Sequence, residues 1–269
     1  MNRQFRPLFV TGYPRSGTTL LSALVSTSPA SNPMATECIW LTKLVEAYVY
    51  GLQQFDVHTN GYFDNASAFT ACNAALIDTV LQGHWERFGR PDVLVLKDPL
   101  LLALVPELCA LVPDATVAVM VRDIRDVVAS QVERVRRWTG NPNWYESGAV
   151  HNEADKYVSQ YSRLVQDQNI LSERIVCIRY ESLASGVDMA VLEGVLGLPD
   201  MDVSRLWKRA FFDIVRFTEH EAFSPLWGQQ VSPDDIGQHR FTLDESDAET
   251  ISDDSDGVEK LFSLYRGIA

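Results

Sequence analysis

The chain is poor in cysteine and has no apolar run long enough to cross a membrane. Its 269 residues include four cysteines, and no two of them form a Cys-x-x-Cys pair. Scattered cysteines of this kind predict small buried side chains rather than disulfides or a zinc site. The longest apolar stretch, 100–112, contains Pro106 and Glu107 and is shorter than the roughly 20 residues of a membrane span. A strand beginning near Leu8 would leave no room for a cleaved leader. We therefore expect a cytoplasmic protein without a transmembrane segment.

Positive charge is also scarce. The chain has 23 Lys and Arg against 36 Asp and Glu, which gives a net charge of -13. This excess of negative charge argues against nonspecific binding to nucleic acids or anionic membranes. An anionic ligand would need a local group of basic side chains, so each basic residue at a strand end is informative. An apolar fraction of 46% is typical of a globular protein, and we expect one domain over residues 1–269.

The most informative segment is 10–21, which reads Val-Thr-Gly-Tyr-Pro-Arg-Ser-Gly-Thr-Thr-Leu-Leu. An apolar run leads into a glycine turn, and an apolar-periodic helix follows. In such a layout, the loop and the helix N-terminus direct backbone N–H groups at a phosphate. Gly12 and Gly17 have the spacing of a Walker A loop, but Thr18 replaces the lysine that contacts the β- and γ-phosphates. The loop therefore predicts phosphate binding without ATP hydrolysis or phosphoryl transfer.

Apolar runs alternate with helical patterns along the chain. Strands are predicted at 8–12, 93–97, 116–121 and 175–179, and helices at 17–26, 101–111, 123–137, 153–171, 188–196 and 258–265. This alternation predicts an α/β fold of the P-loop NTPase-like type, in which helices cover both faces of a central parallel sheet in three layers. Ligands of such folds bind at the carboxyl ends of the strands. Insertions near 37–92, 138–152 and 217–241 are expected to form lids and acceptor-side walls. The first is expected to be helical over 37–89, and the second to be a loop.

Four motifs, in this order, resemble those of sulfotransferases that use 3'-phosphoadenosine-5'-phosphosulfate (PAPS). The loop 12–19 resembles the 5'-phosphosulfate loop, in the arginine version of the tyrosylprotein sulfotransferase branch. Leu-Lys-Asp-Pro at 96–99 resembles the Lys-Asp-Pro turn of the same branch. Arg122 and Ser130 resemble the 3'-phosphate site, and 179–183 resembles the Tyr-Glu-x-Leu strand end. The resemblance implies transfer of a sulfuryl group from PAPS to a hydroxyl or amine, with PAP as the product and no metal required.

The resemblance also implies which residues bind the donor. They lie in the loop, at two strand ends and in a later basic segment: Arg15, Ser16, Gly17, Thr18, Thr19, Arg122, Ser130, Tyr180 and Arg240. A guanidinium and a serine hydroxyl two helical turns apart can hold one phosphate between them. Three alternatives remain open: an ion pair of Arg122 with a nearby aspartate, a solvated Ser130, and a core position for Tyr180.

Three residues are the candidates for catalysis. Lys97 ends a buried strand, where an ammonium can neutralise the charge that grows on the departing phosphate; its alternative is an ion pair with Asp98. Arg15 would stabilise the same phosphate from the loop. Many cytosolic members have a histidine base near Lys97, and this chain has none there. The tyrosylprotein branch has a glutamate shortly after the first helix, and Glu37 falls at this place with a one-residue slip. Glu37 is therefore the predicted general base, and it should be partly buried; a charge at the start of the next helix is the alternative.

The acceptor and two rival functions stay open at this point. Aromatic residues in the inserted segments suggest a small-molecule or lipid-like acceptor, although a core role explains them equally well: Trp40, Tyr48, Trp85, Trp138, Trp144, Tyr145 and Trp227. One rival is a magnesium-dependent nucleotide or small-molecule kinase with a degenerate P-loop. The other is a noncatalytic nucleotide-binding module.

Overall fold

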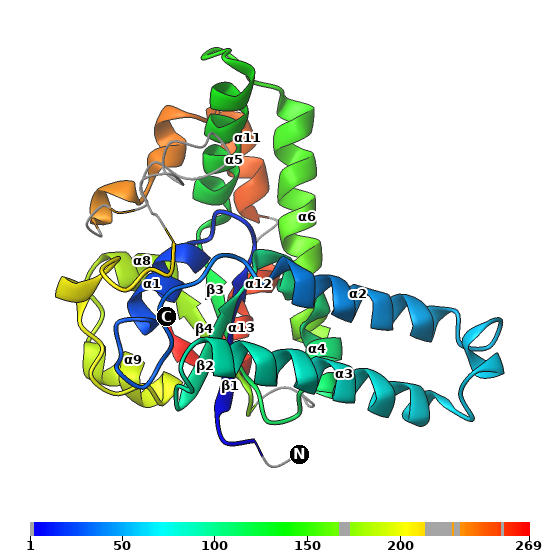
Figure 1. Cartoon of the computed structure of the whole chain (residues 1–269). Helices are drawn as coiled ribbons and strands as arrows, with labels where there is room; N and C mark the ends of the chain where they lie inside the picture. Colours follow the sequence, from blue (N-terminus) through cyan, green and yellow to red (C-terminus); the bar gives the residue numbers. More distant parts are fainter. Residues whose placement is uncertain (1–2, 167–172, 213–227, 229–231, 254–255) are drawn as a thin grey trace.

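A parallel five-stranded sheet forms the centre of the computed structural model, which describes residues 3–166, 173–212, 228, 232–253 and 256–269. The strands lie in the order β2-β1-β3-β4-β5 (Figure 1). Their bounds are β1 Arg6–Gly12, β2 Val93–Lys97, β3 Thr116–Val121, β4 Ile175–Arg179 and β5 Arg266–Ile268. The predicted α/β fold is confirmed, and the first four strands lie within two residues of their predicted bounds. The fifth, at the sheet edge, was missed.

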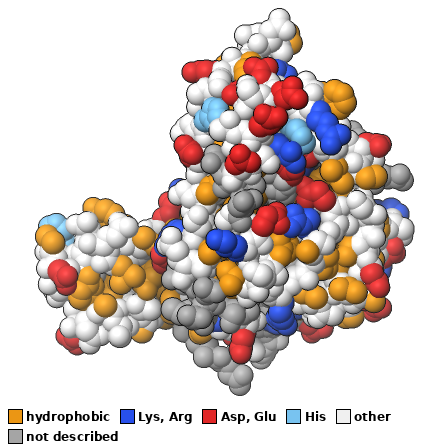
Figure 2. Space-filling model, turned by 180° about the vertical axis from the view of Figure 1, so that it is seen from behind, with side chains coloured by type: hydrophobic (Ala, Val, Ile, Leu, Met, Phe, Trp, Pro, Cys, Tyr) orange, Lys and Arg blue, Asp and Glu red, His pale blue; other side chains and the backbone are white. Residues whose placement is uncertain are grey.

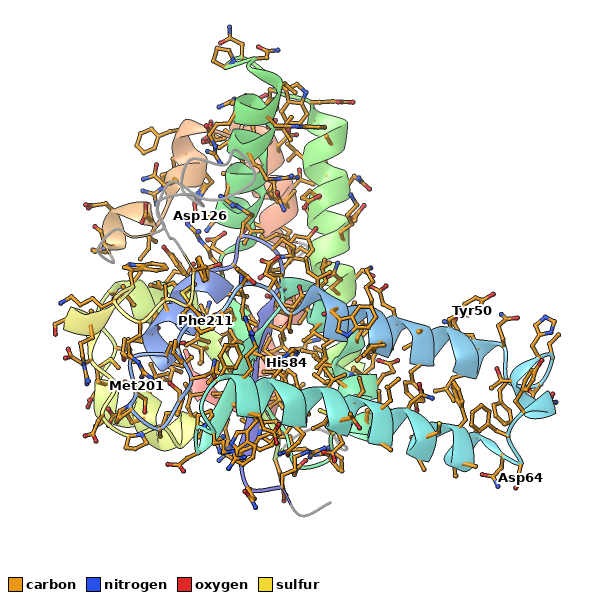
Figure 3. The ribbon with its side chains drawn as sticks, viewed as in Figure 1. Tyr50, Asp64, His84, Asp126, Met201 and Phe211 are labelled. Carbon is orange, nitrogen blue, oxygen red and sulfur yellow. The ribbon has the colours of Figure 1, made fainter. Side chains whose placement is uncertain are left out.

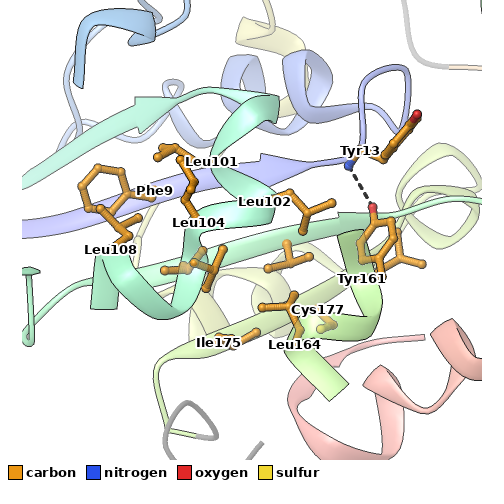
Figure 4. Packing of buried hydrophobic residues seen from close by; sticks show 14 of the residues in the cluster. Phe9, Tyr13, Leu101, Leu102, Leu104, Leu108, Tyr161, Leu164, Ile175 and Cys177 are labelled. Atoms are coloured by element: carbon orange, nitrogen blue, oxygen red, sulfur yellow. Dashed lines mark hydrogen bonds between the residues drawn. The ribbon is translucent and has the colours of Figure 1, made fainter. Parts of the chain in front are cut away.

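Both faces of the sheet are covered, because the central strands are apolar at successive positions. One face, which includes Phe9, packs against α4 (Val105–Leu111) and α6 (Ser147–Gln166), as Figure 4 shows. The other face, which includes Leu8, packs against α1 (Thr18–Val25) and α9 (Met189–Leu196). All five residues of β2 are buried, Lys97 among them. The sheet therefore holds its carboxyl-end residues in fixed places.

Several helices differ from their predicted bounds. The predicted helix 101–111 begins instead as a 3-10 helix, η2 (Pro99–Leu104), which is capped by the Asp98 carboxylate through a hydrogen bond from Leu100 N. Helix α6 begins at Ser147, so the predicted loop 138–152 is shorter than expected; the predicted helix end at Leu171 lies outside the described residues. The predicted helix 258–265 is two short helices. The remaining elements are α5 Ile124–Thr139, α8 Tyr180–Ala184, η3 Val203–Arg205, η4 Pro233–Asp235, η5 Gln238–Phe241, α11 Glu245–Asp253, α12 Asp256–Glu259 and α13 Leu261–Leu264.

The first insertion forms a helical arm that projects from the body of the molecule (Figure 1). It consists of α2 (Ile39–Gln53) and α3 (Ala66–Arg87), with η1 (Thr59–Gly61) near the far end. The helical prediction for this segment is confirmed. Figure 2 shows mostly apolar and uncharged surface on the arm, in agreement with a sequence that has no Lys or Arg from 44 to 86. Among the described helices, none has the length and hydropathy of a membrane span.

Candidate active site

The phosphate loop connects β1 to α1 and depends on two glycines. Gly12 has φ +148°, and a Cβ there would lie 2.5 Å from Met120 O. Gly17 has φ +99°, and a Cβ there would lie 2.5 Å from Cδ2 of Tyr180. Any L side chain would be strained at these positive φ values and would also clash. The loop is anchored to α6, because Tyr13 N donates a hydrogen bond to Tyr161 Oη at 3.0 Å (Figure 4).

Lys97 and Glu37, predicted for catalysis from different motifs, are in direct contact. Lys97 Nζ donates to Glu37 Oε1 at 2.9 Å and to Thr19 Oγ1 at 3.2 Å. The lysine side chain is 2% exposed and that of Glu37 is 32% exposed, so the expectation that the Glu37 side chain is partly buried is confirmed. The end of β2, the start of α1 and the segment before α2 therefore meet at one point.

Two contacts hold Glu37 at this place. Cys38 N, the next backbone amide, donates to Lys97 O at 2.9 Å. Thr42, on α2, donates to the Asp98 carboxylate at 2.5 Å. Burial raises the pKa of Asp98, and the hydrogen bonds from Thr42 and Leu100 N partly oppose this shift. Asp98, the alternative partner of Lys97, thus links α2 to the strand end, while the carboxylate that pairs with Lys97 is that of Glu37.

Arg15 extends toward α5. Its backbone has φ +76°, and its Nε donates to Ser130 Oγ at 2.9 Å. The alternative of a solvated Ser130 is therefore wrong. Burial is the largest cause that lowers the pKa of Arg15, and the nearby guanidinium groups of Arg137, Arg134 and Arg122 add to it, so that the pKa is about 10. Arg15 thus joins the phosphate loop to the predicted 3'-phosphate residues.

Sequence reasoning missed Arg134 and Arg137 in this basic cluster. They follow Ser130 by four and seven residues on α5, a spacing that places all three on one helix face. That spacing was the available signal. Nε and Nη2 of Arg137 are buried and have no hydrogen-bond partner among the residues that the structure describes. In a chain of net charge -13, such a gathering of positive charge favours an anionic ligand.

Arg122 is buried at the end of β3. Its guanidinium carbon lies 4.2 Å from the centre of the Tyr180 ring, so the ring is both buried and part of the site. Nη2 donates to Asp235 O at 2.7 Å and lies 3.8 Å from Asp126 Oδ2. The predicted alternative, an ion pair with an aspartate, is therefore present with Asp126. Arg122 Nε is buried and has no partner in the described part of the chain.

The structure describes all four residues of the predicted basic segment 237–240. Arg240 is exposed on η5, with its Nε 3.9 Å from the place where a Gly237 Cβ would lie. His239, which no motif had singled out, is buried and bonded to Asp126. Of the wider insertion 217–241, residues 217–227 and 229–231 lie outside the described residues, and so does Trp227.

The aromatic residues proposed for the acceptor side fall into two groups. Tyr48 and Trp85 are 4% and 6% exposed and belong to the core, which is one of the two alternatives that the sequence left open. Trp144 and Tyr145 pack partly buried against that core. Trp40 and Trp138 are 67% and 72% exposed. An aromatic residue in the core and one in a pocket wall cannot be told apart from the sequence, which is why both alternatives were open.

Together, these residues can hold a ligand with two separated anionic groups. Lys97 contacts Thr19 at the start of α1, while Arg122 donates to Arg15 O and Arg15 bonds to Ser130 on α5. One observation fits a bound phosphate ester: Arg122 Nε is buried and lacks a hydrogen-bond partner in the described chain. Among those same residues, no group of three or more His, Cys, Asp or Glu is arranged to hold a metal ion.

Comparison with solved structures shows the same fold in known sulfotransferases. The sulfotransferase domain of the olefin synthase from Synechococcus PCC 7002 superposes with a TM-score of 0.57 at 15% identity, covering 94% of this chain and 95% of that one. The sulfotransferase domain from the curacin biosynthetic pathway gives 0.56 at 19% identity, covering 94% and 98%. A sulfotransferase from Mycobacterium avium gives 0.52 at 15% identity, covering 99% and 79%.

Sequence comparison finds a matching family but no individual relative. The chain matches no curated protein closely enough to count as a relative. The model of the sulfotransferase family matches residues 7–196, which include β1 to β4, the phosphate loop and the strand-end residues described above. Since this match covers well over half of the chain, the protein belongs to the sulfotransferase family.

Proposed function

We propose that this sulfotransferase uses PAPS as its donor and transfers the sulfuryl group to a hydroxyl, or an amine, of a small or lipid-like acceptor. The observation that carries the proposal is the contact of Lys97 with both Glu37 and Thr19, beside a phosphate loop that lacks the Walker lysine. A cation and a carboxylate next to the loop match the needs of group transfer from a phosphosulfate.

The donor would be bound at two subsites. The Ser16 hydroxyl and the amides and hydroxyls from Gly17 to Thr19 would hold the 5'-phosphosulfate at the start of α1, since Ser16 N already donates to Tyr13 O. Arg122 and Ser130 would hold the 3'-phosphate, with Tyr180 at the nucleoside. Arg15 bonds to Ser130 in the free protein and lies between the two subsites. Arg240 would join them only through a change from its exposed position.

The proposed chemistry assigns one task to each catalytic residue. Bound PAPS supplies an activated sulfuryl group. Glu37 accepts the proton of the acceptor hydroxyl, which makes the oxygen a better nucleophile. Lys97 neutralises the negative charge that grows on the departing phosphate, and Arg15 assists from the loop. The 2.9 Å contact between Lys97 Nζ and Glu37 Oε1 supports this division of roles.

Fewer observations support the class of acceptor than support the donor. With Tyr48 and Trp85 in the core, Trp40 is the exposed aromatic residue nearest in sequence to Glu37, at the start of α2. An apolar side chain there favours an acceptor with an apolar portion. Two of the structures with this fold are domains of an olefin synthase and of the curacin biosynthetic pathway, and a biosynthetic role would agree with them.

Calorimetric titration without acceptor tests the donor. We expect tight binding of PAP, much weaker binding of 5'-AMP, and no dependence on magnesium. Preference for ATP with magnesium would instead support a kinase. If none of the three nucleotides bound, a noncatalytic member of the fold would be the better description. A screen of alcohols with PAPS would follow a positive result.

A further inference from the structure

A buried carboxylate on α5 holds the segment 232–242, which contains η4 and η5. The Asp126 side chain is 0% exposed. Its Oδ2 accepts a hydrogen bond from Gly237 N at 2.7 Å, and its Oδ1 accepts one from His239 N at 3.0 Å. His239 Nδ1 lies 2.8 Å from the same Oδ1 and carries the proton between them, because a carboxylate can only accept. Figure 3 shows Asp126 on the side of α5 that faces this segment.

The same segment contacts the predicted 3'-phosphate residue. Arg122 Nη2 donates to Asp235 O at 2.7 Å and lies 3.8 Å from Asp126 Oδ2. The Tyr180 ring covers the guanidinium at 4.2 Å. Arg122 is therefore held by a ring, by a carbonyl oxygen of the segment and by a carboxylate, while its buried Nε keeps no partner among the described residues.

The neighbouring acids have other partners. Asp123 pairs with Arg125 at 2.5 Å, and Glu181 Oε1 accepts a hydrogen bond from Asp123 N at 2.9 Å. Gly237 has φ +79°, and at this turn the amides of residues 237 and 239 both point at Asp126. Because these two amides donate to Asp126, they do not contact Arg122. The segment holds Arg122 through the hydrogen bond that Arg122 Nη2 donates to Asp235 O.

We propose that Asp126, together with His239, is a positioning residue for the donor: it anchors the segment 232–242 and so fixes Arg122 for the 3'-phosphate. The inference rests on the proposed function, since it needs a donor with a 3'-phosphate. It assigns no contact with substrate to Asp126. Loss of the carboxylate would release both anchored amides and with them the Asp235 carbonyl that holds Arg122, and would thereby weaken binding of the 3'-phosphate specifically. Removal of the negative charge would by itself favour the phosphate, so a loss of affinity reports the loss of positioning.

The test compares the affinities of PAP and 5'-AMP, which differ by the 3'-phosphate. In Asp126→Asn we expect PAP affinity to fall about tenfold or more, the scale of a lost charged hydrogen bond, with AMP affinity changed by less than about twofold. His239→Ala should lower the PAP-to-AMP affinity ratio as well. His239→Asn should restore the ratio, because its Nδ2 can donate where Nδ1 does. Each measurement is made by calorimetry, without acceptor or turnover.

A matched control separates positioning from general loss of structure. Asp247 on α11 is another buried aspartate with a histidine partner, His151, at 3.1 Å, and it also accepts from Tyr145 and Ser147. Asp247→Asn should lower thermal stability and leave the PAP-to-AMP ratio unchanged. If it changed the ratio as much as Asp126→Asn does, the effect would be a general one and the inference would be wrong.

Arg122→Ala distinguishes failure of the inference from failure of the proposed function. If Arg122→Ala leaves PAP affinity unchanged, the 3'-phosphate site itself is wrong. If it weakens PAP and Asp126→Asn does not, only the positioning role of Asp126 is wrong. When both roles are right, Asp126→Asn adds little in the Arg122→Ala background, since its effect passes through Arg122.

Discussion

Lys97 Nζ lies 2.9 Å from Glu37 Oε1 although the two residues are 60 positions apart in the chain. The lysine side chain is almost fully buried at the end of β2, whereas a third of the Glu37 side chain is open to solvent. An incoming hydroxyl can therefore reach the carboxylate, while the ammonium is fixed in place. We therefore expect a substitution of Glu37 to change the rate without changing the binding of the donor.

Glu37→Gln should remove most of the turnover and leave donor affinity unchanged. The amide keeps the size of the side chain and cannot accept a proton as a carboxylate does. A general base contributes about 10²–10⁴-fold, so we expect a loss of kcat on that scale, with PAP affinity by calorimetry equal to that of the unmodified protein. Unchanged turnover would eliminate Glu37 as the base.

Lys97→Ala should lower the rate by about 10²–10³-fold, the scale at which one charge-stabilising donor acts. The folded state should persist, because the strand residues around it stay buried. Lys43→Ala is the matched control: this lysine is exposed on α2 and pairs with Glu46. Steady-state kinetics on both variants check the prediction. Equal effects of the two substitutions would show that general charge, rather than position, is what matters.

Asp98→Asn should stabilise the protein above the acid range. Burial raises the pKa of Asp98 above its ordinary value of 3.8. Between the unfolded and folded pKa values the native state keeps a proton that the unfolded chain has lost, so the free energy of unfolding falls as pH rises through this window. Asparagine cannot ionise, and it can still accept from Leu100 N and donate to Thr42.

Urea denaturation at several pH values measures this effect. The advantage of the Asp98→Asn variant should grow as pH rises through the window and stay constant above it. Asp155→Asn, at an exposed position of α6, serves as the control and should show no such growth. Parallel stability curves for Asp98→Asn and the unmodified protein would contradict the assigned cause of the shift.

Much of the site could be predicted from the sequence because apolar runs determine the sheet. Once β1, β2 and β3 are parallel neighbours, their carboxyl ends meet at one edge, and Lys97 and Arg122 must lie there with the loop. Glu37 was found through a resemblance of spacing. The family and the fold followed from the same motifs.

Side-chain directions and long-range links could not be predicted in the same way. The contact of Arg15 with Ser130 depends on a positive φ at a residue other than glycine. The bond between Asp126 and His239 joins residues 113 positions apart, with no pattern in either segment that marks it. Strand β5 has three residues, too few for a period of two to be recognised.

Arg137→Gln should stabilise the free protein and weaken binding of PAP. The Arg137 guanidinium lies near those of Arg15, Arg134 and Arg122. Burial first, and this crowding of like charges second, lower the pKa of Arg15 to about 10. Removing one of several like charges should raise the free energy of unfolding by about 0.2–0.5 kcal/mol. The same charge favours an anion, so PAP affinity should fall by up to about tenfold, and its dependence on salt should weaken.

Arg136→Gln is the control, since this neighbour pairs with Glu133 and bonds to Trp144 O. This variant should lose stability and keep its affinity for PAP. Thermal denaturation and calorimetry at two salt concentrations give both quantities, and a loss of stability in Arg137→Gln would contradict a like-charge cluster that only an anion relieves.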